Sequence, residues 1–167
     1  MKGFVEGPED KFGNRKIVNL DQVTNICFEQ YTDRYQEKKW KVIFNFSYGI
    51  SLKDNLSKII PDYCYFIYNT DTLSEYKSVK QVLNNQVNSG EWIAPLDKTI
   101  DRIVNKDFVS FIATDPRKNR IIVNLTTGVS FHNNYSQITS DFVYFDFSTP
   151  EKYVLELKYM KDLISVN

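Results

Sequence analysis

The chain has 167 residues, which is enough for one domain of ordinary size or two small ones packed closely together. Its 21 Lys and Arg residues balance 21 Asp and Glu residues, so no excess of positive charge indicates a polyanionic partner. With 42% hydrophobic and 25% charged residues, the composition is that of a globular protein and excludes a disordered or collagen-like chain. There is no apolar run of about 18 residues and no apolar segment near the start. We therefore expect a cytoplasmic protein with no membrane contact.

The residue usage favours a β-rich fold. Alanine, the best helix former, occurs only at Ala94 and Ala113, whereas the strand formers tyrosine and phenylalanine number 11 and 12. Lysine outnumbers arginine by 16 to 5, and asparagine occurs 15 times, which is typical of AT-rich genomes. Phages, mobile elements and low-GC bacteria commonly have such genomes, so a phage or mobile element is an expected source.

The first half of the chain is predicted to be mostly strands. After an extended N-terminal segment, we predict strands at residues 17–28, 40–47, 50–52 and 63–68. Asn19 and Asp21 favour a local turn that interrupts the first strand. Gly49 fits a hairpin turn that needs a positive φ, which glycine adopts without steric cost.

A helix is predicted to end each half. Apolar residues recur at helical spacing over residues 72–87, and Thr72 with Glu75 has the form of a capping box at the start. The second helix is expected to begin at Pro150, because Thr149 can cap it and proline is favoured at the first helical position.

The second half of the chain repeats the first. Residues 39–68 and 118–147 align at a constant offset of 79 with 11 identities in 30 positions. Residues 16–28 and 102–114 align at an offset of 86 with 6 identities in 13 positions, and the seven extra residues of the first copy fall in a longer loop around residues 29–38. We interpret the chain as an α+β tandem duplication of a β-β-β-β-α unit, with mostly antiparallel sheets, one helix per repeat and a pseudo-twofold arrangement.

This interpretation also predicts the domain organisation. The expected parts are an N-terminal extended segment at 1–14, repeat 1 at 15–88, a connector at 89–100 and repeat 2 at 101–167. We expect both repeats in one compact domain, because a unit of about 80 residues is marginal in the surface that it can bury. Trp92 in the connector is expected to dock on the body and to fix the orientation of the two copies.

Comparing the copies assigns two faces to each sheet. Alternate positions that are apolar in both copies are assigned to the core: Val42, Phe44 and Phe46 with Ile121, Val123 and Leu125, and Cys64, Phe66 and Tyr68 with Val143, Phe145 and Phe147. The opposite face carries aromatic and polar residues in both copies, including Tyr65 and Tyr144. This second face is either the contact between the copies or a surface that binds something else.

Residue types that support catalysis or metal binding are few. Cys27 and Cys64 align with small apolar residues of the other copy, so we expect buried, unpaired thiols, which suit the cytoplasm. The single histidine, His132, aligns with Lys53 and is expected to be exposed. No zinc, phosphate-loop, dinucleotide or nucleophile-elbow motif occurs. We therefore expect no enzymatic activity, no metal and no cofactor.

The favoured function is a non-enzymatic protein-interaction or assembly module that binds an unknown protein partner or a second copy of itself. The longer loop of the first copy carries amphipathic rings that are typical of interface anchors. The predicted partner-binding residues are Tyr31, Arg34, Tyr35, Trp40, Tyr65 and Tyr144.

The alternative function is single-stranded nucleic-acid binding. Basic residues gather at equivalent places near the start of the second strand in each copy, and the candidate contacts are Lys38, Lys39, Lys41, Arg117, Lys118 and Arg120. Basic groups beside aromatic rings form the platforms on which such proteins stack bases. The element order is similar to that of the PUR-type and PC4-like folds. The zero net charge counts against this alternative, and lysines that protect a solvated hairpin end are the other interpretation.

Overall fold

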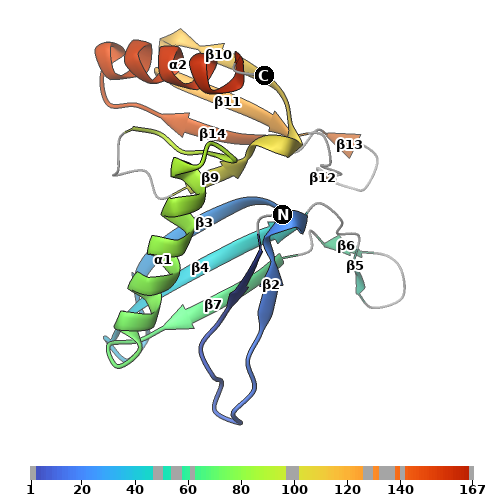
Figure 1. The fold of residues 1–167 in the computed structure, drawn as a ribbon, viewed down its shortest axis with the longest axis vertical. Coiled ribbons are helices and arrows are strands. Elements are labelled where there is room, and N and C mark those ends of the chain that lie inside the picture. Colours follow the sequence, from blue (N-terminus) through green and yellow to red (C-terminus); the bar gives the residue numbers. More distant parts are fainter. Residues whose placement is uncertain are drawn as a thin grey trace.

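The computed structural model of the protein describes residues 3–46, 51–53, 58–60, 63–96, 102–125, 130–131, 138–139 and 142–165. Within these ranges the fold is α+β, with antiparallel sheets and two α-helices (Figure 1). The predicted turn at Gly49 and the predicted exposure of His132 lie outside the described residues.

The largest sheet has five strands and combines both halves of the chain. In spatial order its strands are β7 (Tyr63–Tyr68), β4 (Lys38–Phe46), β3 (Val23–Thr32), β9 (Arg102–Asn105) and β8 (Trp92–Ile93). Every neighbouring pair is antiparallel. The first half of the chain thus supplies three strands of this sheet, and the second half supplies the other two.

A second sheet and three strand pairs complete the β-structure of the described residues. The second sheet has the order β10 (Val109–Asp115), β11 (Arg120–Leu125) and β14 (Phe142–Asp146). The strand pairs are β1 (Phe4–Glu6) with β2 (Ile17–Asn19), β5 (Ser51–Lys53) with β6 (Lys58–Ile60), and β12 (Ser130–Phe131) with β13 (Ile138–Thr139). Short 3-10 helices lie at Leu20–Gln22, Lys106–Phe108 and Pro116–Lys118, so the predicted interruption of the first strand is confirmed.

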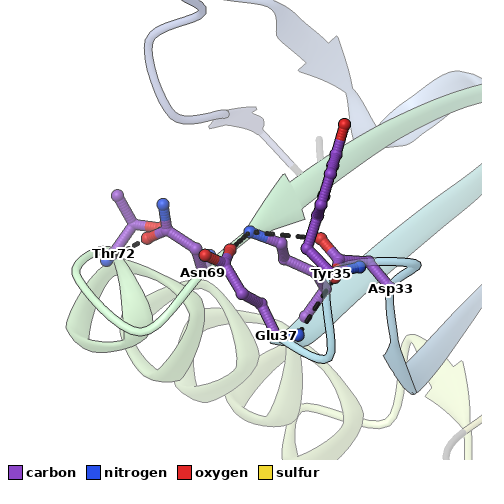
Figure 2. Close-up of polar contacts among 6 residues, drawn as sticks. Asp33, Tyr35, Glu37, Asn69 and Thr72 are labelled. Carbon is purple, nitrogen blue, oxygen red and sulfur yellow. Dashed lines mark hydrogen bonds and ion pairs between the residues drawn. The ribbon is translucent and has the colours of Figure 1, made fainter.

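The two helices are α1 (Leu73–Asn88) and α2 (Pro150–Ser165), close to the predicted positions. The predicted capping box at Thr72 is wrong. The Thr72 hydroxyl accepts a hydrogen bond from the Asn69 N–H at 2.9 Å, and the Asn69 side-chain oxygen accepts one from the Thr72 N–H at 3.0 Å (Figure 2). The hydroxyl is therefore engaged with Asn69 instead of the first turn of α1. At α2 the predicted cap is confirmed, because the Thr149 hydroxyl accepts a hydrogen bond from the Lys152 N–H at 3.2 Å.

Each helix packs on a sheet and encloses a separate core. The first core includes Val42, Phe44, Phe66, Tyr68, Tyr76 and Leu83. The second includes Ile121, Val123, Val143, Phe145, Tyr153 and Met160. The predicted assignment of alternate apolar residues to the core is therefore confirmed, with Phe46 and Cys64 only partly buried at its margin.

Neither cysteine forms a disulfide in the described structure, as predicted, but both are half-buried rather than buried. Cys27 follows Ile26 on β3, and because strand residues alternate between faces, its side chain points away from the first core. It lies opposite Ile43 of β4 and Arg102 of β9 on the second face. This partial burial still raises the pKa of the Cys27 thiol above its ordinary value.

The pair β8–β9 joins the two halves (Figure 1). On β9, Ile103 faces the first core, whereas the next residue, Val104, faces the second. On β8, Trp92 lies in the first core and Ile93 in the second. Trp92 is fully buried, which confirms its predicted docking.

The way the halves meet differs from the expected arrangement. A pseudo-twofold arrangement makes each contact between the halves reciprocal, so a pairing of β3 with β9 would be matched by a pairing of their aligned counterparts, β10 and β2. β3 does pair with β9, but within the described residues β10 pairs with β11 alone and β2 with β1 alone. The pseudo-twofold prediction is therefore wrong, because the shared strand β9 imposes a head-to-tail relation between the halves.

Candidate interaction surface

The second faces of the two sheets carry stacked pairs of aromatic side chains. On β7 the rings of Tyr63 and Tyr65 stack with their centroids 6.1 Å apart. On β14 the rings of Phe142 and Tyr144 stack at 5.9 Å. All four side chains are exposed in the described structure. These aromatic faces are therefore not the contact between the two halves, which is made by β3 and β9 instead.

A basic side chain lies over one ring of each pair. The Lys41 ammonium is 4.9 Å from the centroid of the Tyr65 ring, and the Arg120 guanidinium is 4.1 Å from that of Tyr144. Lys41 and Arg120 occupy equivalent positions in the aligned copies. Such cation–π contacts contribute about 0.5–1 kcal/mol at exposed sites. We call the set Lys41, Tyr63, Tyr65, Arg120, Phe142 and Tyr144 the aromatic–basic faces.

Carboxylates partly neutralise both basic groups. Arg120 donates two hydrogen bonds to Asp146, one of them 2.8 Å long between Nη2 and Oδ2. This contact holds the pKa of the Asp146 carboxyl below its ordinary value. Lys41 lies 3.8 Å from a carboxylate oxygen of Glu29. The aromatic–basic faces therefore expose aromatic rings and basic groups whose positive charge is partly neutralised by neighbouring carboxylates.

The long loop predicted around residues 29–38 is instead an extension of the β3–β4 hairpin. Strand pairing continues to Thr32 opposite Lys38, and only residues 33–37 form the turn. The Asp33 carboxylate accepts hydrogen bonds from the Tyr35 N–H at 2.9 Å and the Glu37 N–H at 3.0 Å (Figure 2). The loop prediction was wrong because β3 has no buried residue beyond Phe28, so no apolar alternation marks its last part.

The four contact residues predicted in this segment do not form one surface. Tyr31 lies opposite Lys39 on the second face, exposed to solvent. Trp40 points to the other face, where its half-buried ring lies 6.3 Å from that of Tyr76 on α1. Tyr35 stands exposed at the turn, with the Arg34 guanidinium 4.7 Å from its ring centroid.

The predicted basic residues are also divided between two places. Lys41 and Arg120 lie beside the aromatic rings, as described above. The other four lie at the two hairpin ends: Lys38, Lys39, Arg117 and Lys118. The Lys39 ammonium is engaged there by carboxylates, 2.6 Å from Glu37 and 3.8 Å from Asp33, and the Glu37 contact raises the pKa of Lys39.

Sequence reasoning missed the contribution of the N-terminal segment to this surface. The Lys16 ammonium lies 5.2 Å from the Tyr65 ring centroid. A groove of about 310 Å³ lies between the β1–β2 connection and β7 and is lined in part by Lys16, Tyr65 and Ile67. The alignment pairs Lys16 with Arg102, but no sequence pattern indicated that Lys16 would reach the ring of Tyr65.

Two further findings concern the described residues. Among them, no group of three or more His, Cys, Asp or Glu side chains is placed to hold a metal ion. Neither α1 nor α2 is long and apolar enough to cross a membrane.

No family model, no curated protein and no solved structure matches the chain. The similarity to PUR-type and PC4-like folds therefore rests on element order alone.

Proposed function

We propose that this protein is a cytoplasmic, non-enzymatic protein-interaction or assembly module built as a tandem duplication. The observation that carries the proposal is that both halves expose a stacked aromatic pair with a cation over the ring of Tyr65 or Tyr144. Exposed rings are costly to leave in water and are enriched where proteins meet. A feature that is kept in both halves and that the described residues leave exposed is best explained by contact with a partner.

Details of local geometry support the duplication. Several features recur at aligned positions of the two halves: the β-bulges after Val23 and Val109, the turns capped by Asn19 and Asn105, and the hydrogen bonds from the Thr24 and Ser110 hydroxyls to the Asn45 and Asn124 carbonyls. The strand registers correspond as well, with Val42 opposite Phe66 in one half and Ile121 opposite Phe145 in the other. The recurrence of bulges and side-chain bonds at the same offsets supports a common origin of the two halves.

The proposal is tested by removing the rings from both halves. In the double variant Tyr65→Ser, Tyr144→Ser we expect capture of the partner from the native host to fall at least tenfold, with an unchanged melting temperature. The matched control, Val82→Ser with Val154→Ser, removes exposed apolar side chains from the two helices and should capture as the wild type does. Equal capture by both double variants, or no specific capture by the wild type, would contradict the proposal.

Single-stranded nucleic acid is the second candidate ligand, because Lys41 and Arg120 lie directly over tyrosine rings. Bases that stack on such rings contribute about 1–3 kcal/mol each. The test is binding of a fluorescent single-stranded oligonucleotide at two salt concentrations. Affinity that falls steeply with salt would favour this candidate, since phosphate contacts release counterions. Absence of binding at low salt would reject it.

A further inference from the structure

The N-terminal strand pair β1–β2 has the same place in the first half as β8–β9 has in the second. Each is an antiparallel pair that ends at an asparagine, with Phe4 opposite Asn19 and Trp92 opposite Asn105. In each pair of strands, one cross-strand pair of apolar residues packs into the core of its own half. Val5 and Val18 lie in the first core, as Ile93 and Val104 lie in the second. The neighbouring residues on the opposite face therefore occupy equivalent positions: Phe4 is equivalent to Trp92, and Ile17 is equivalent to Ile103.

The corresponding residues differ sharply in what covers them. Trp92 and Ile103 are 0% and 4% exposed, because they pack into the core of the preceding half. Phe4 and Ile17 are 64% and 67% exposed. The N-terminal pair thus presents the same kind of apolar surface that β8–β9 presents, but the described residues leave this surface exposed.

The second half lacks the partner that such a surface would need: strand β10 has one edge without a neighbouring strand among the described residues. In the first half, β3 pairs on one side with β4 and on the other with β9. The equivalent strand β10 pairs within the described residues with β11 alone. Phe111 on β10 is 55% exposed, whereas Asn25 at the aligned position of β3 is 6% exposed. An unpaired strand edge is a template for a further strand.

We propose that a second copy of this chain covers both surfaces, with β2 of one copy pairing with the free edge of β10 of the next. The register would repeat that of β3 with β9, which places Val18 opposite Phe111, Ile17 opposite Ile112 and Lys16 opposite Ala113. Phe4 and Ile17 would then pack toward the second core of the neighbour. The inference rests on the tandem duplication proposed above, and it is independent of the aromatic–basic faces.

A side-chain hydrogen bond fixes this register. Within the chain, the buried Asn105 amide donates to the Val23 carbonyl at 2.8 Å, while its oxygen accepts from the Asp107 N–H. Asn19 makes the second of these bonds, to the Asp21 N–H at 3.0 Å. In the proposed contact its amide nitrogen would reach the carbonyl of Val109 in the neighbouring copy.

The contact is heterologous, because it joins two different surfaces of the same chain. Such contacts generate rings when the rotation closes and open filaments when it does not. Main-chain pairing at a sheet edge gives affinity, and the side chains that alternate along the strand give specificity. A single charge placed at either surface should therefore stop the growth of the assembly at that surface.

The test uses the purified full-length protein and measures its mass by sedimentation as a function of concentration. The wild type should increase in mass above the 19.6 kDa of one chain as concentration rises. Ile17→Asp and Phe111→Asp should each stay monomeric, because each blocks one of the two surfaces. The matched control Val154→Asp, which charges an exposed apolar residue of α2, should assemble as the wild type does.

Mixing the two blocked variants gives the sharpest outcome. Ile17→Asp keeps an intact β10 and Phe111→Asp keeps an intact β2, so an equimolar mixture should give a species of twice the chain mass and nothing larger. A monomeric mixture, a wild type that remains monomeric at about 1 mM, or assembly by Ile17→Asp alone would overturn the proposal.

Folding and the aromatic–basic faces are controlled separately. Both altered residues are exposed in the single chain, so the cooperative melt should be retained; if either variant loses it, Ile17→Ser and Phe111→Ser replace them in the same design. Failure of assembly leaves the capture result with Tyr65→Ser, Tyr144→Ser unaffected, because that experiment reports a different surface.

Discussion

Asn105 connects the two halves of the chain through its side-chain nitrogen, while its side-chain oxygen caps the local turn. The residue is fully buried, its oxygen accepts from the Asp107 N–H at 3.2 Å and its nitrogen donates to the Val23 carbonyl at 2.8 Å. Asn19 is its aligned counterpart, and it makes the first type of bond while remaining half-buried. The two asparagines therefore form a natural matched pair.

Substitution of the two residues by alanine should have unequal effects. Asn105→Ala should lower the free energy of unfolding by about 2–4 kcal/mol, because it removes two hydrogen bonds and leaves the buried Val23 carbonyl unpaired. Asn19→Ala should cost about 1 kcal/mol, the typical net value of one hydrogen bond. Urea denaturation at a concentration where the wild type is monomeric measures both. Equal losses would show that the Val23 bond contributes nothing.

The hydroxyl group of Tyr68 lies in the apolar first core. Its side chain is buried in the first core, and its hydroxyl has no hydrogen-bond partner among the described residues. Burial also raises the pKa of the hydroxyl well above its ordinary value. The aligned residue of the second half is Phe147, which lies in the second core without a hydroxyl.

Tyr68→Phe should therefore stabilise the protein. Removing a buried and unpaired hydroxyl recovers its desolvation cost, so the free energy of unfolding should rise by about 1 kcal/mol. The exposed Tyr144→Phe is the control and should leave stability unchanged. A loss of stability in Tyr68→Phe would mean that the hydroxyl has a partner in the folded protein.

At the scale of single elements, the tip of the β3–β4 hairpin extends beyond the other strands of the five-stranded sheet. Its last two residue pairs, Tyr31 opposite Lys39 and Thr32 opposite Lys38, have no further strand beside them among the described residues, because β7 ends at Tyr68 opposite Trp40. Trp40 is the last residue of the hairpin that packs on the core. The tip beyond it should therefore be dispensable for folding.

Replacing residues 31–39 by an Asn-Gly turn tests this. The shortened hairpin should keep the melting temperature within about 2 °C of the wild type, since most of the deleted side chains are exposed. Trp40→Ala should instead lower the melting temperature by about 4–8 °C, which corresponds to roughly 2 kcal/mol of lost packing. A large loss on shortening would mean that the tip packs elsewhere in the protein.

The turn of this hairpin should respond to acid through Asp33. The pKa of Asp33 is lowered first by the hydrogen bond from the Glu37 N–H and also by that from the Tyr35 N–H. Because the folded-state pKa is depressed, the stabilisation is complete above the ordinary carboxyl pKa and is lost as the pH falls through the lower folded value. An NMR titration should show the Tyr35 and Glu37 amide signals moving together with the Asp33 carboxyl. Asp33→Asn should abolish that shared transition.

Elements with one buried face could be predicted from the sequence, and elements without one could not. Val42 and Phe44 lie at alternate positions that are apolar in both aligned copies, and this comparison assigned the core face of β4 correctly. The hairpin tip has solvent on both faces, so its strands resembled a loop. The capping box failed for a competing reason, because Asn69 lies within reach of the Thr72 hydroxyl and nothing in the spacing of Thr72 and Glu75 reveals that.

The candidate surface was predictable only in part. Tyr65 and Tyr144 were found because aligned copies keep a ring at the same exposed position. Tyr31 and Trp40 were grouped by their closeness in sequence, but alternation along paired strands places them on opposite faces. The exposed Ile17 and the buried Ile103 have the same residue type in the same local pattern. Their burial differs only because Ile103 packs against the first half of the chain, and the sequence does not reveal how the two halves are arranged.

For the whole molecule, the shared pair β8–β9 makes the first half dependent on the second. A fragment of residues 1–89 lacks Trp92 and Ile103, which fill the first core. We expect that fragment to lack a cooperative melt, because its sheet edge and core remain open. A fragment of residues 1–105 restores both strands and should melt cooperatively. Circular dichroism of the two fragments provides the measurement, and a sharp transition in the shorter one would show that the first half folds alone.

The same strand also determines when the protein can fold during synthesis. Asn105 and its partner Val23 are separated by 82 positions in the chain. Domains generally fold as they leave the ribosome, starting from the N-terminus. Here the first unit cannot close its core until the opening strands of the second have emerged. Nascent chains that end before Asn105 would therefore have an unpaired edge at β3 and an incompletely filled first core. Unpaired strand edges and exposed apolar side chains are the features that molecular chaperones recognise in incomplete proteins.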